Sequence, residues 1–257
     1  MKRLAALAFA LLPALAFAQL PARPEPLRAG VEFQSADVRA LQADDFANPG
    51  MLWVDRGAAL WRELPANGKP SCEACHGDAA RSMKGVAARL PAYDAALGRV
   101  ANLEARIESC HRARQGGPGL APESEALLSL TAYVAHQSRG LPVRVAVGGE
   151  AAPSFEKGRA LFFRRIGQLN LACTHCHDAN WGRTLLAEKV SQGHPTGWPA
   201  YRLEWQAAGS LHRRLRACFY GVRAEQPAHG SEDLIALELY LAWRAQGLAV
   251  EAPGVRR

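Results

Sequence analysis

Long apolar runs are scarce in this chain of 257 residues, and the only one lies at the very start. It extends from Leu4 to about Phe17, follows Lys2 and Arg3, and ends at an Ala-Phe-Ala sequence, residues 16–18. A charged start, an apolar stretch too short to cross a bilayer comfortably and a small-x-small site are typical of a secretory signal peptide. The alternative is an uncleaved membrane anchor. We expect cleavage after residue 18 and an exported protein, located in the periplasm, with no membrane span.

A strong excess of one charge is also missing. The 31 Lys and Arg against 24 Asp and Glu give a formal net charge of +7, and loss of Lys2 and Arg3 with the signal peptide leaves +5. The basic residues are spread along the chain, without the stripe that nucleic-acid binders show, so we expect no nucleic-acid partner. The modest excess is compatible with a small anionic substrate or an acidic partner.

Strand patterns are sparse, and an internal repeat is present instead. SCEACHG from Ser71 recurs as ACTHCHD from Ala172, LPAYDAALGRVANLEARIESC from Leu90 matches WPAYRLEWQAAGSLHRRLRAC from Trp198, and SEALLSLTAYVAHQSRGLPV from Ser124 matches SEDLIALELYLAWRAQGLAV from Ser231. The second member of each pair starts 101, 108 and 107 residues after the first. Three matches in the same order at a nearly constant offset indicate that one unit occurs twice.

The last matched segment predicts a helix in each copy. Leu234, Leu237 and Leu241 fall on one face at helical spacing, with Ser231 placed as the N-cap and Gly247 just past the end. Ser124 and Gly140 occupy the same places in the first copy. Shorter helices are expected before each cysteine motif, from Arg56 and from Glu156.

Two motifs contain four of the six cysteines. CEACH at residues 72–76 and CTHCH at residues 173–177 both fit C-x-x-C-H, the attachment motif of c-type haem. Two thiols one helical turn apart add to the two haem vinyl groups, and the following histidine reaches the iron. A redox dithiol would need a βαβ context that the chain lacks, and a shared zinc site is disfavoured by the separation of about a hundred residues. The expected attachment residues are Cys72, Cys75, Cys173 and Cys176, and the expected proximal iron ligands are His76 and His177.

Together these patterns predict an all-α protein with two tandem cytochrome c-like haem domains related by an internal repeat, and two covalently attached c-type haems. We assign residues 1–18 to the signal peptide and 19–50 to an N-terminal extension that wraps the first domain or a partner. Residues 51–145 form the first domain and residues 146–257 the second. The segment 140–154 is the expected linker.

Methionine is too scarce to complete both haem sites. After signal cleavage the chain has only Met51 and Met83, neither of which follows the second motif, so a methionine ligand from within the second domain is excluded. Histidine remains open as the sixth ligand, although no candidates align between the copies. The candidates are His111 and His136 in the first domain and His194, His212 and His229 in the second.

Cysteine, in contrast, does align between the copies. Cys110 follows His76 by 34 residues and Cys218 follows His177 by 41, and both stand in the pattern R-[IL]-x-x-C. A Cys110–Cys218 disulfide and two buried free thiols are the alternatives to ligation of both haems. Nearby guanidinium groups favour the thiolate form, and a thiolate ligand should depress the haem potential.

The arginines that precede and follow these cysteines extend the pattern into a recognisable signature. R-x-x-x-C-[FY]-x-G-V-R-A-E, from Arg214 to Glu225, together with two C-x-x-C-H motifs, resembles the SoxA family. SoxA proteins are the dihaem c-type cytochrome subunits of the SoxAX complex of periplasmic sulfur oxidation. The resemblance covers nearly the whole mature chain.

The resemblance implies an L-cysteine S-thiosulfotransferase, which oxidatively couples thiosulfate to the carrier cysteine of SoxY in SoxYZ and passes two electrons to c-type haem. It also implies a SoxX-like monohaem cytochrome c as partner in a heterodimer. By the same resemblance the second domain, residues 146–257, holds the active-site haem. Cys218 is its distal ligand and can carry a persulfide, Arg214 anchors thiosulfate, and Cys110 ligates the other haem. Two charges on thiosulfate also explain the arginines by charge matching alone.

Two other functional classes remain compatible with the residues. One is a purely electron-transferring dihaem cytochrome c with thiolate-ligated, low-potential haems. The other is a sensor whose haem-thiolate binds a gas. In either case Arg214 would be a solvated helix charge, and Cys218 would carry no sulfur chemistry.

Overall fold

The computed structural model describes residues 23–257, so the predicted signal peptide, residues 1–18, lies outside the described residues. The α-helices are α1 (Ala36–Ala43), α2 (Met51–Arg62), α3 (Cys72–His76), α4 (Ala79–Ser82), α5 (Leu103–Gln115), α6 (Glu125–His136), α7 (Ala152–Phe163), α8 (Cys173–His177), α9 (Leu211–Gly221) and α10 (Glu232–Arg244). The short 3-10 helices are η1 (Gly30–Phe33), η2 (Ala87–Arg89) and η3 (Gly149–Ala151). The strands are β1 (Ala92–Asp94), β2 (Arg99–Ala101), β3 (Thr184–Leu185), β4 (Glu188–Lys189), β5 (Ala200–Arg202), β6 (Ala207–Gly209) and β7 (Gly254–Arg256).

Helices dominate the described residues, but the strands correct the all-α expectation. β1 and β2 form one antiparallel hairpin, β3 and β4 a second, and β5 and β6 a third, which β7 extends by pairing with β5 in parallel. Each strand has only two or three residues. Such short strands leave no alternating pattern in the sequence, which is why sequence reasoning missed them.

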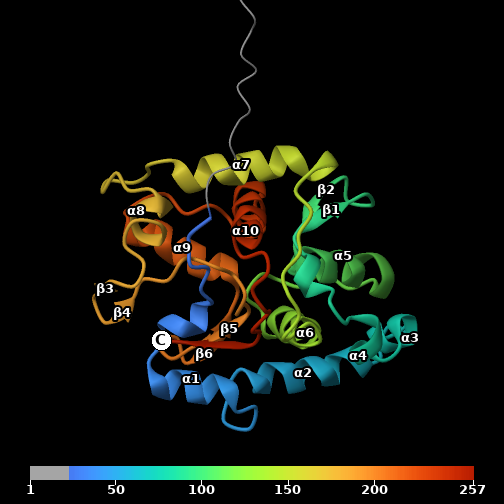
Figure 1. Ribbon diagram of the computed structural model, residues 1–257. Helices are drawn as coiled ribbons and strands as arrows, with labels where there is room; N and C mark the ends of the chain where they lie inside the picture. The colour runs from blue at the N-terminus through green and yellow to red at the C-terminus, as the bar shows by residue number, and fades with distance from the viewer. Residues whose placement is uncertain (1–22) are drawn as a thin grey trace, which may run out of the picture.

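The helices of the two sequence copies pack in the same way. Figure 1 shows α7 lying over α10 at the top and α2 lying under α6 at the bottom. A Cβ on Gly57 of α2 would lie 2.1 Å from the Ser129 carbonyl oxygen, and one on Gly158 of α7 would lie 1.9 Å from that of Ala236. Glycine therefore permits the close crossing of each pair, at positions that match between the copies. We call residues 51–145 the first repeat and residues 146–257 the second.

The starts of α6 and α10 agree with the sequence prediction, whereas those of α2 and α7 differ from it. The Ser124 and Ser231 hydroxyls accept hydrogen bonds from the Leu127 and Leu234 amides, which confirms both predicted N-caps. In contrast, α2 and α7 begin at Met51 and Ala152, four to five residues before the expected starts. Neither start has a side-chain cap that the sequence would show, and α7 has a proline in its first turn, where proline is tolerated.

The segment expected to be a linker is partly a contact between the repeats. The Gly140 amide donates to the Val250 carbonyl at 2.9 Å, and the Gly247 amide donates to the Val143 carbonyl at 3.1 Å. These four positions are equivalent in the repeat, so the two chain segments meet in antiparallel fashion about a local twofold relation. Val143 and Val145 are buried, and helix already begins at Ala152.

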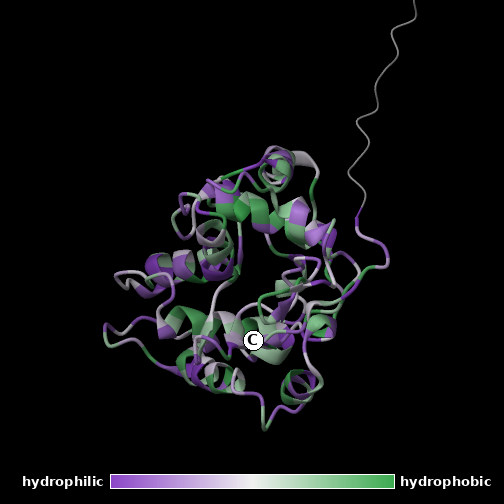
Figure 2. Cartoon of the chain, turned by 90° about the vertical axis from the view of Figure 1, so that its left-hand side faces the viewer, coloured by the Kyte–Doolittle hydropathy of each residue, from purple (hydrophilic) through white to green (hydrophobic). Residues whose placement is uncertain are grey.

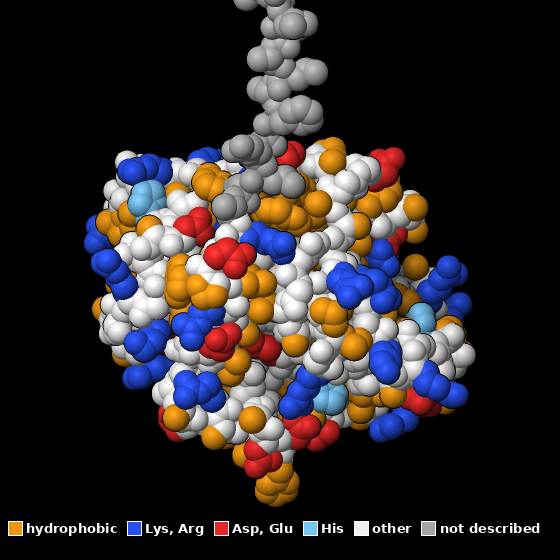
Figure 3. Space-filling view, viewed as in Figure 1, with side chains coloured by type: hydrophobic (Ala, Val, Ile, Leu, Met, Phe, Trp, Pro, Cys, Tyr) orange, Lys and Arg blue, Asp and Glu red, His pale blue; other side chains and the backbone are white. Residues whose placement is uncertain are grey.

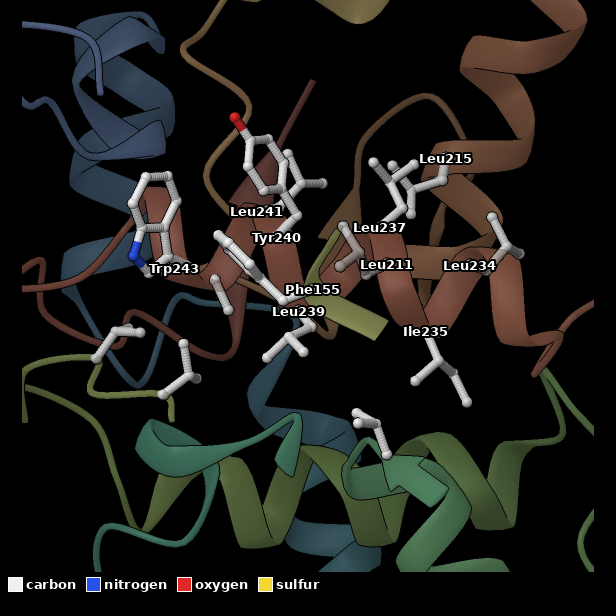
Figure 4. Packing of buried hydrophobic residues seen from close by; sticks show 14 of the residues in the cluster. Phe155, Leu211, Leu215, Leu234, Ile235, Leu237, Leu239, Tyr240, Leu241 and Trp243 are labelled. Carbon is white, nitrogen blue, oxygen red and sulfur yellow. The ribbon is translucent and has the colours of Figure 1, made fainter. Parts of the chain in front are cut away.

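The main hydrophobic core lies in the second repeat and at its junction with the first. Figure 4 shows α10 at its centre, with Leu234, Leu237 and Tyr240 facing side chains of α7 and α9. A smaller cluster around Trp61 and Val134 lies in the first repeat, beside Cys72. Figure 2 shows helices that mix apolar and polar residues, as expected when one face packs inward. In Figure 3, Lys and Arg side chains are scattered over the visible face among acidic ones.

A small polar cavity of about 40 Å³ lies where the repeats meet. Glu238 of α10 accepts a hydrogen bond from Asn102 Nδ2 at 2.8 Å and lies 3.1 Å from His212 Nε2. The Gly230 amide donates to the other His212 ring nitrogen, Nδ1, at 3.1 Å. Burial, with the charges of Glu238 and Glu123, raises the pKa of Glu104 in this cluster to about 8, although His212 opposes the shift.

The described part of the N-terminal extension packs mainly against the second repeat, although Asp45 also pairs with Arg139 of the first. The Arg28 amide donates to Gln192 Oε1, and Gln192 Nε2 donates to the Pro26 carbonyl, both at 2.8 Å. Farther along, Gln42 Oε1 accepts the Val255 amide at 2.9 Å. The described part of the extension therefore supports the loop that follows α8. Among the described residues, no helix is both long and apolar enough to cross a membrane.

Candidate active site around Cys218

Both C-x-x-C-H motifs fold as single helical turns. The Ser71 hydroxyl caps α3 by accepting the Ala74 amide at 3.1 Å. At α8 the His175 Nδ1 atom accepts the Ala172 amide at 2.9 Å and so takes the place of a cap. A helical turn places the two thiols and the following histidine of each motif close together, as c-type haem attachment requires.

A hydrogen bond to the backbone orients His177. Its Nδ1 atom lies 2.7 Å from the Ser191 carbonyl oxygen, so Nδ1 carries the proton and Nε2 is left as a free electron-pair donor. Gly193 lies against the ring with φ of +77°, and a Cβ there would come within 3.1 Å of it. Buried Gln192, held by the N-terminal extension, fixes this loop. The arrangement is that of a metal-ligating histidine with an outer hydrogen bond.

The Cys218 thiol of α9 lies beside His177. Burial raises the pKa of Cys218, but the Arg214 guanidinium, the neighbouring His177 ring and the charge of Arg202 outweigh it and lower the pKa to about 7. Burial, with Cys218 next in effect, raises the pKa of Cys173 to about 12. The structure thus brings the motif cysteines, His177 and Cys218 together, and favours the thiolate at Cys218.

Two arginines accompany Cys218, and sequence reasoning named only one of them. Arg214 lies one helical turn before Cys218, and its Nη2 atom is 4.0 Å from Glu188 Oε2. Arg202 of β5 is 3 % exposed, and its Nη2 atom is 2.9 Å from Glu188 Oε1 and 2.6 Å from Glu204 Oε2. Arg202 and Glu188 were missed because they lie far from the cysteine in sequence. The available signal was the alignment of Arg202 with Asp94.

The equivalent site in the first repeat is more open. Cys110 is exposed, and burial followed by the proximity of Cys75 raises its pKa, while Arg114 opposes. Arg106, the counterpart of Arg214, forms an ion pair with Asp94 at 3.4 Å. The Trp61 ring lies 5.6 Å from the His76 ring and donates its Nε1 proton to the Gly77 carbonyl at 3.0 Å.

The structure does not join the two aligned cysteines to each other. All six cysteines are free thiols, and Cys110 and Cys218 each lie with the motif cysteines of their own repeat. The disulfide between them is therefore not formed in this structure. Neither thiol is an isolated core residue, because each contacts the neighbourhood of a C-x-x-C-H motif.

The three histidines that the sequence left open in the second domain are engaged in other contacts. His212 has both ring nitrogens in the cluster between the repeats, and His229 Nδ1 lies 3.9 Å from Glu123. His194 Nε2 lies 3.1 Å from Gln192 Oε1. Burial, Arg244 and His177 lower its pKa to about 3, so His194 is neutral and supports the loop behind His177.

A buried guanidinium with two N–H groups unpaired within residues 23–257 supports the fit of haem to the second motif. Arg244, at the end of α10, is fully buried over the Phe162 ring and pairs through Nη2 with Asp178, the residue after His177. Among the described residues, its Nε and Nη1 atoms have no hydrogen-bond partner. Two free donors of a buried cation match an anionic group such as a haem propionate. The thiols, the oriented His177 and this guanidinium together fit c-type haem.

Arg223 and Glu225, at the end of the signature, lie at a different place on the surface. Both line a hollow of about 670 Å³ at the end of α9, together with Phe219 and Arg164. Neither Cys218 nor Arg214 is among its lining residues. The signature therefore spans two places, and its N-terminal half accompanies the thiol.

Comparison with known proteins agrees with this site. A family model described as SoxA/TsdA, cytochrome c domain, matches residues 56–143. The chain is 43 % identical over 230 residues to the L-cysteine S-thiosulfotransferase subunit SoxA of Pseudaminobacter salicylatoxidans, covering 89 % of this chain and 80 % of that one. It is 38 % identical over 237 residues to the protein of the same name from Rhodovulum sulfidophilum, covering 91 % and 82 %.

A solved structure shares the fold. The crystal structure of SoxXA from P. pantotrophus superposes with a TM-score of 0.86 at 36 % identity, covering 90 % of this chain and 87 % of that one. The helical, cytochrome c-like character of the fold and covalent attachment of c-type haem follow from these matches. The chain therefore belongs to the SoxA family, the subunit of L-cysteine S-thiosulfotransferases that carries a cytochrome c domain.

Proposed function

We propose that this protein is the catalytic, dihaem subunit of a periplasmic L-cysteine S-thiosulfotransferase. Each repeat, 51–145 and 146–257, forms one cytochrome c-like domain with one covalent haem. Two C-x-x-C-H turns and two equivalent helix pairs support that number. The signal-peptide pattern at residues 1–18 supports the periplasmic location.

The same residue types hold the haem in each domain. In the first domain Cys72 and Cys75 attach it, and His76 and Cys110 ligate its iron; in the second the attachment residues are Cys173 and Cys176, and the ligands are His177 and Cys218. When bound, the second haem supplies a one-electron acceptor next to the sulfur of Cys218. Everything else at the site is contributed by side chains of this chain.

The proposed reaction joins thiosulfate to the carrier cysteine of SoxY in SoxYZ. One S–S bond forms between the carrier sulfur and the outer sulfur of thiosulfate, giving a cysteine S-thiosulfonate. The carrier thiol loses its proton, and the two sulfurs together lose two electrons, so atoms and charge balance. Cys218 first forms an S–S bond to the outer sulfur of thiosulfate, so that it carries a persulfide-type sulfur, and this step releases the two electrons. The carrier thiolate then bonds to that sulfur as its bond to Cys218 breaks, and Cys218 leaves as a thiolate. Arg214 binds the sulfonate oxygens through its planar fork of donors.

The observation that carries this proposal is the placement of Cys218. A half-buried cysteine lies beside His177 and the motif cysteines, with Arg214 one turn away on the same helix. A thiolate is the nucleophilic form of cysteine, and a cation at hydrogen-bonding reach attracts a dianion. A purely electron-transferring cytochrome has no need of an anion site beside its ligand, so this geometry favours the enzyme.

A SoxX-like monohaem cytochrome c completes the proposed heterodimer and receives the electrons. The similarity to a chain of a SoxXA crystal structure over 87 % of that chain supports this partner. SoxYZ is the second, transient partner, and it delivers the carrier thiol. The transferase name of the relatives supports a cysteine thiol as the acceptor.

Peptide mass mapping of the purified, haem-loaded protein tests the proposal. After incubation with thiosulfate, the haem-free peptide that carries Cys218 should show added sulfur or thiosulfate, removable by a reducing agent. The peptide that carries Cys110 is the internal control and should remain unmodified. Equal modification of both peptides, or none at Cys218 while SoxYZ is being loaded, would contradict the assignment.

A further inference from the structure

The charge at one position is reversed between the two repeats. Asp94 of β1 and Arg202 of β5 occupy the same place in LPAYD and WPAYR. The hairpins confirm the equivalence, because Asp94 pairs with Arg99 as Arg202 pairs with Ala207, at the same end of each ladder. In the first repeat, Asp94 neutralises Arg106 at 3.4 Å. In the second repeat the corresponding residues are two arginines, Arg202 and Arg214.

The carboxylate that separates these two arginines comes from an inserted segment. His76 precedes Leu90 by 14 residues, whereas His177 precedes Trp198 by 21. The longer connection contains the hairpin β3–β4, which has no counterpart in the first repeat, and Glu188 starts β4. The reversal of charge and the new carboxylate therefore occur together in the second repeat.

Glu188 bridges the two guanidinium groups with one oxygen each. Oε1 lies 2.9 Å from Arg202, and Oε2 lies 4.0 Å from Arg214. Arg202 also contacts the exposed Glu204, and its buried Nε atom has no hydrogen-bond partner among the described residues. The Arg214 contact is the longer one, and both Arg214 and Glu188 are 37 % exposed. Solvent screening weakens such a pair, so an incoming dianion can compete for it.

We propose that Arg202 and Arg214 together form the binding site for the thiosulfate dianion, and that the Glu188 carboxylate occupies it until substrate displaces it. This inference rests on the proposed function and adds a second anion-binding residue and a built-in competitor to it. The carboxylate of Glu188 stands where a sulfonate group would sit, between two forks of N–H donors. The Glu188 carboxylate also excludes anions that bind weakly. Only an anion that binds both arginines more strongly than this single negative charge displaces it.

Binding of thiosulfate to the haem-loaded protein tests the proposal by isothermal titration calorimetry, with the haems kept reduced and the carrier absent so that thiosulfate cannot modify Cys218 oxidatively. Glu188→Gln keeps the size of the side chain but removes the competing charge, so thiosulfate should bind about three- to tenfold tighter. Arg202→Gln should weaken binding about tenfold or more, by loss of one charge-assisted contact. Arg202→Lys keeps the charge and should fall between wild type and Arg202→Gln, because it lacks the fork.

Glu125→Gln is the matched control. Glu125 pairs with Arg56 at 3.5 Å in the first repeat, so this variant makes the same change in net charge far from Cys218. Its thiosulfate affinity should stay within about twofold of wild type. Circular dichroism and both haem spectra confirm that each variant is folded and loaded before its affinity is compared.

The outcomes separate this inference from the proposed function. If Glu188→Gln binds thiosulfate no tighter than wild type, or as much tighter as Glu125→Gln, Glu188 is no competitor and the inference is wrong. If Arg202→Gln binds thiosulfate as wild type does while Arg214→Ala is impaired, Arg202 has only a structural role. The two-arginine site is then wrong, whereas the anion site of the proposed function stands. If Arg214→Ala also binds as wild type, the proposed anion site itself fails.

Discussion

The helices α5 and α9 each begin with a side-chain N-cap, Asn102 and Ser210, and carry an arginine and a cysteine at the same spacing. The surroundings of the two cysteines nevertheless differ. Burial and Cys75 raise the pKa of exposed Cys110, whereas the surroundings of Cys218 lower its pKa to about 7. Asp94 pairs with Arg106 in the first repeat, while Arg202 lies near Arg214 in the second. The difference shows that residues outside the motif set the charge around each of the two equivalent thiols.

In the proposed function, duplication separates holding a haem from doing chemistry beside it. Both repeats keep the helix pair, the C-x-x-C-H turn and the downstream cysteine. Only the second combines an oriented histidine, a low-pKa thiol and two arginines that share a carboxylate. We infer that Cys110 only ligates, and that Cys218 ligates and also carries sulfur.

The largest effect is expected from the cysteines themselves. Cys218→Ala should reduce thiosulfate-dependent loading of SoxYZ by about a thousandfold or more, because it removes the sulfur-carrying group. Cys110→Ala should change the potential and spectrum of the first haem and reduce turnover by less than about tenfold. Steady-state rates with the SoxX-like partner and SoxYZ present measure both. Equal losses in the two variants would erase the proposed division of roles.

The next effect concerns the paired arginines. Arg214→Ala should lower kcat/KM for thiosulfate about 10- to 100-fold through loss of charge-assisted hydrogen bonds, with both haem spectra intact. Arg106→Ala breaks a partly exposed ion pair with Asp94 and should leave kcat/KM within about twofold. Loss of the second haem in Arg214→Ala would show a structural role instead.

A smaller effect, on stability, is expected at the loop that holds His177. Gly193→Ala must place a Cβ about 3.1 Å from the imidazole ring at φ of +77°, so it should cost about 2–3 kcal/mol and perturb the second haem spectrum. Gly182→Ala has nearly the same φ, +82°, but meets nothing within 4 Å, so it should cost only about 1 kcal/mol. Denaturant unfolding compares the two. Equal costs would mean that the ring contact has no energetic weight.

The smallest effect should appear only as a function of pH. Glu104 and His212 occupy equivalent positions in α5 and α9, and the pKa of Glu104 is raised from 4.5 to about 8. The folded state therefore holds this proton more tightly than the unfolded chain, and its stabilising effect is lost as the pH rises from about 4.5 to about 8. Glu104→Gln should melt a few degrees above wild type near pH 8.5 and about equally near pH 4.

Glu108→Gln is the control for this pH effect, because Glu108 pairs with Arg112 on the open side of the same helix. Its melting temperature should follow the wild-type pH profile. A Glu104→Gln profile parallel to wild type across this range would show that Glu104 is ionised at neutral pH in the folded protein.

Local signals in the sequence were sufficient for the repeated helical elements. The caps at Ser124 and Ser231 and the two C-x-x-C-H turns depend on residues within a few positions of one another, so they were predicted correctly. The short hairpins, the early starts of α2 and α7, and the docking of the extension on the second repeat were not. Each of these depends on contacts with distant segments, such as Gln42 with Val255.

The sequence by itself predicted where haem attaches, and it determined that one helical unit occurs twice and that Cys110 and Cys218 are equivalent, because covalent motifs and helical periodicity are local. It also indicated that Arg214 accompanies Cys218. Only the tertiary structure decided that Arg202 and Glu188 join them, since β5 and the inserted hairpin reach α9 through packing rather than chain proximity. The charge around a thiol is set by whichever segments surround it in space, and that is why two equal motifs have unequal chemistry.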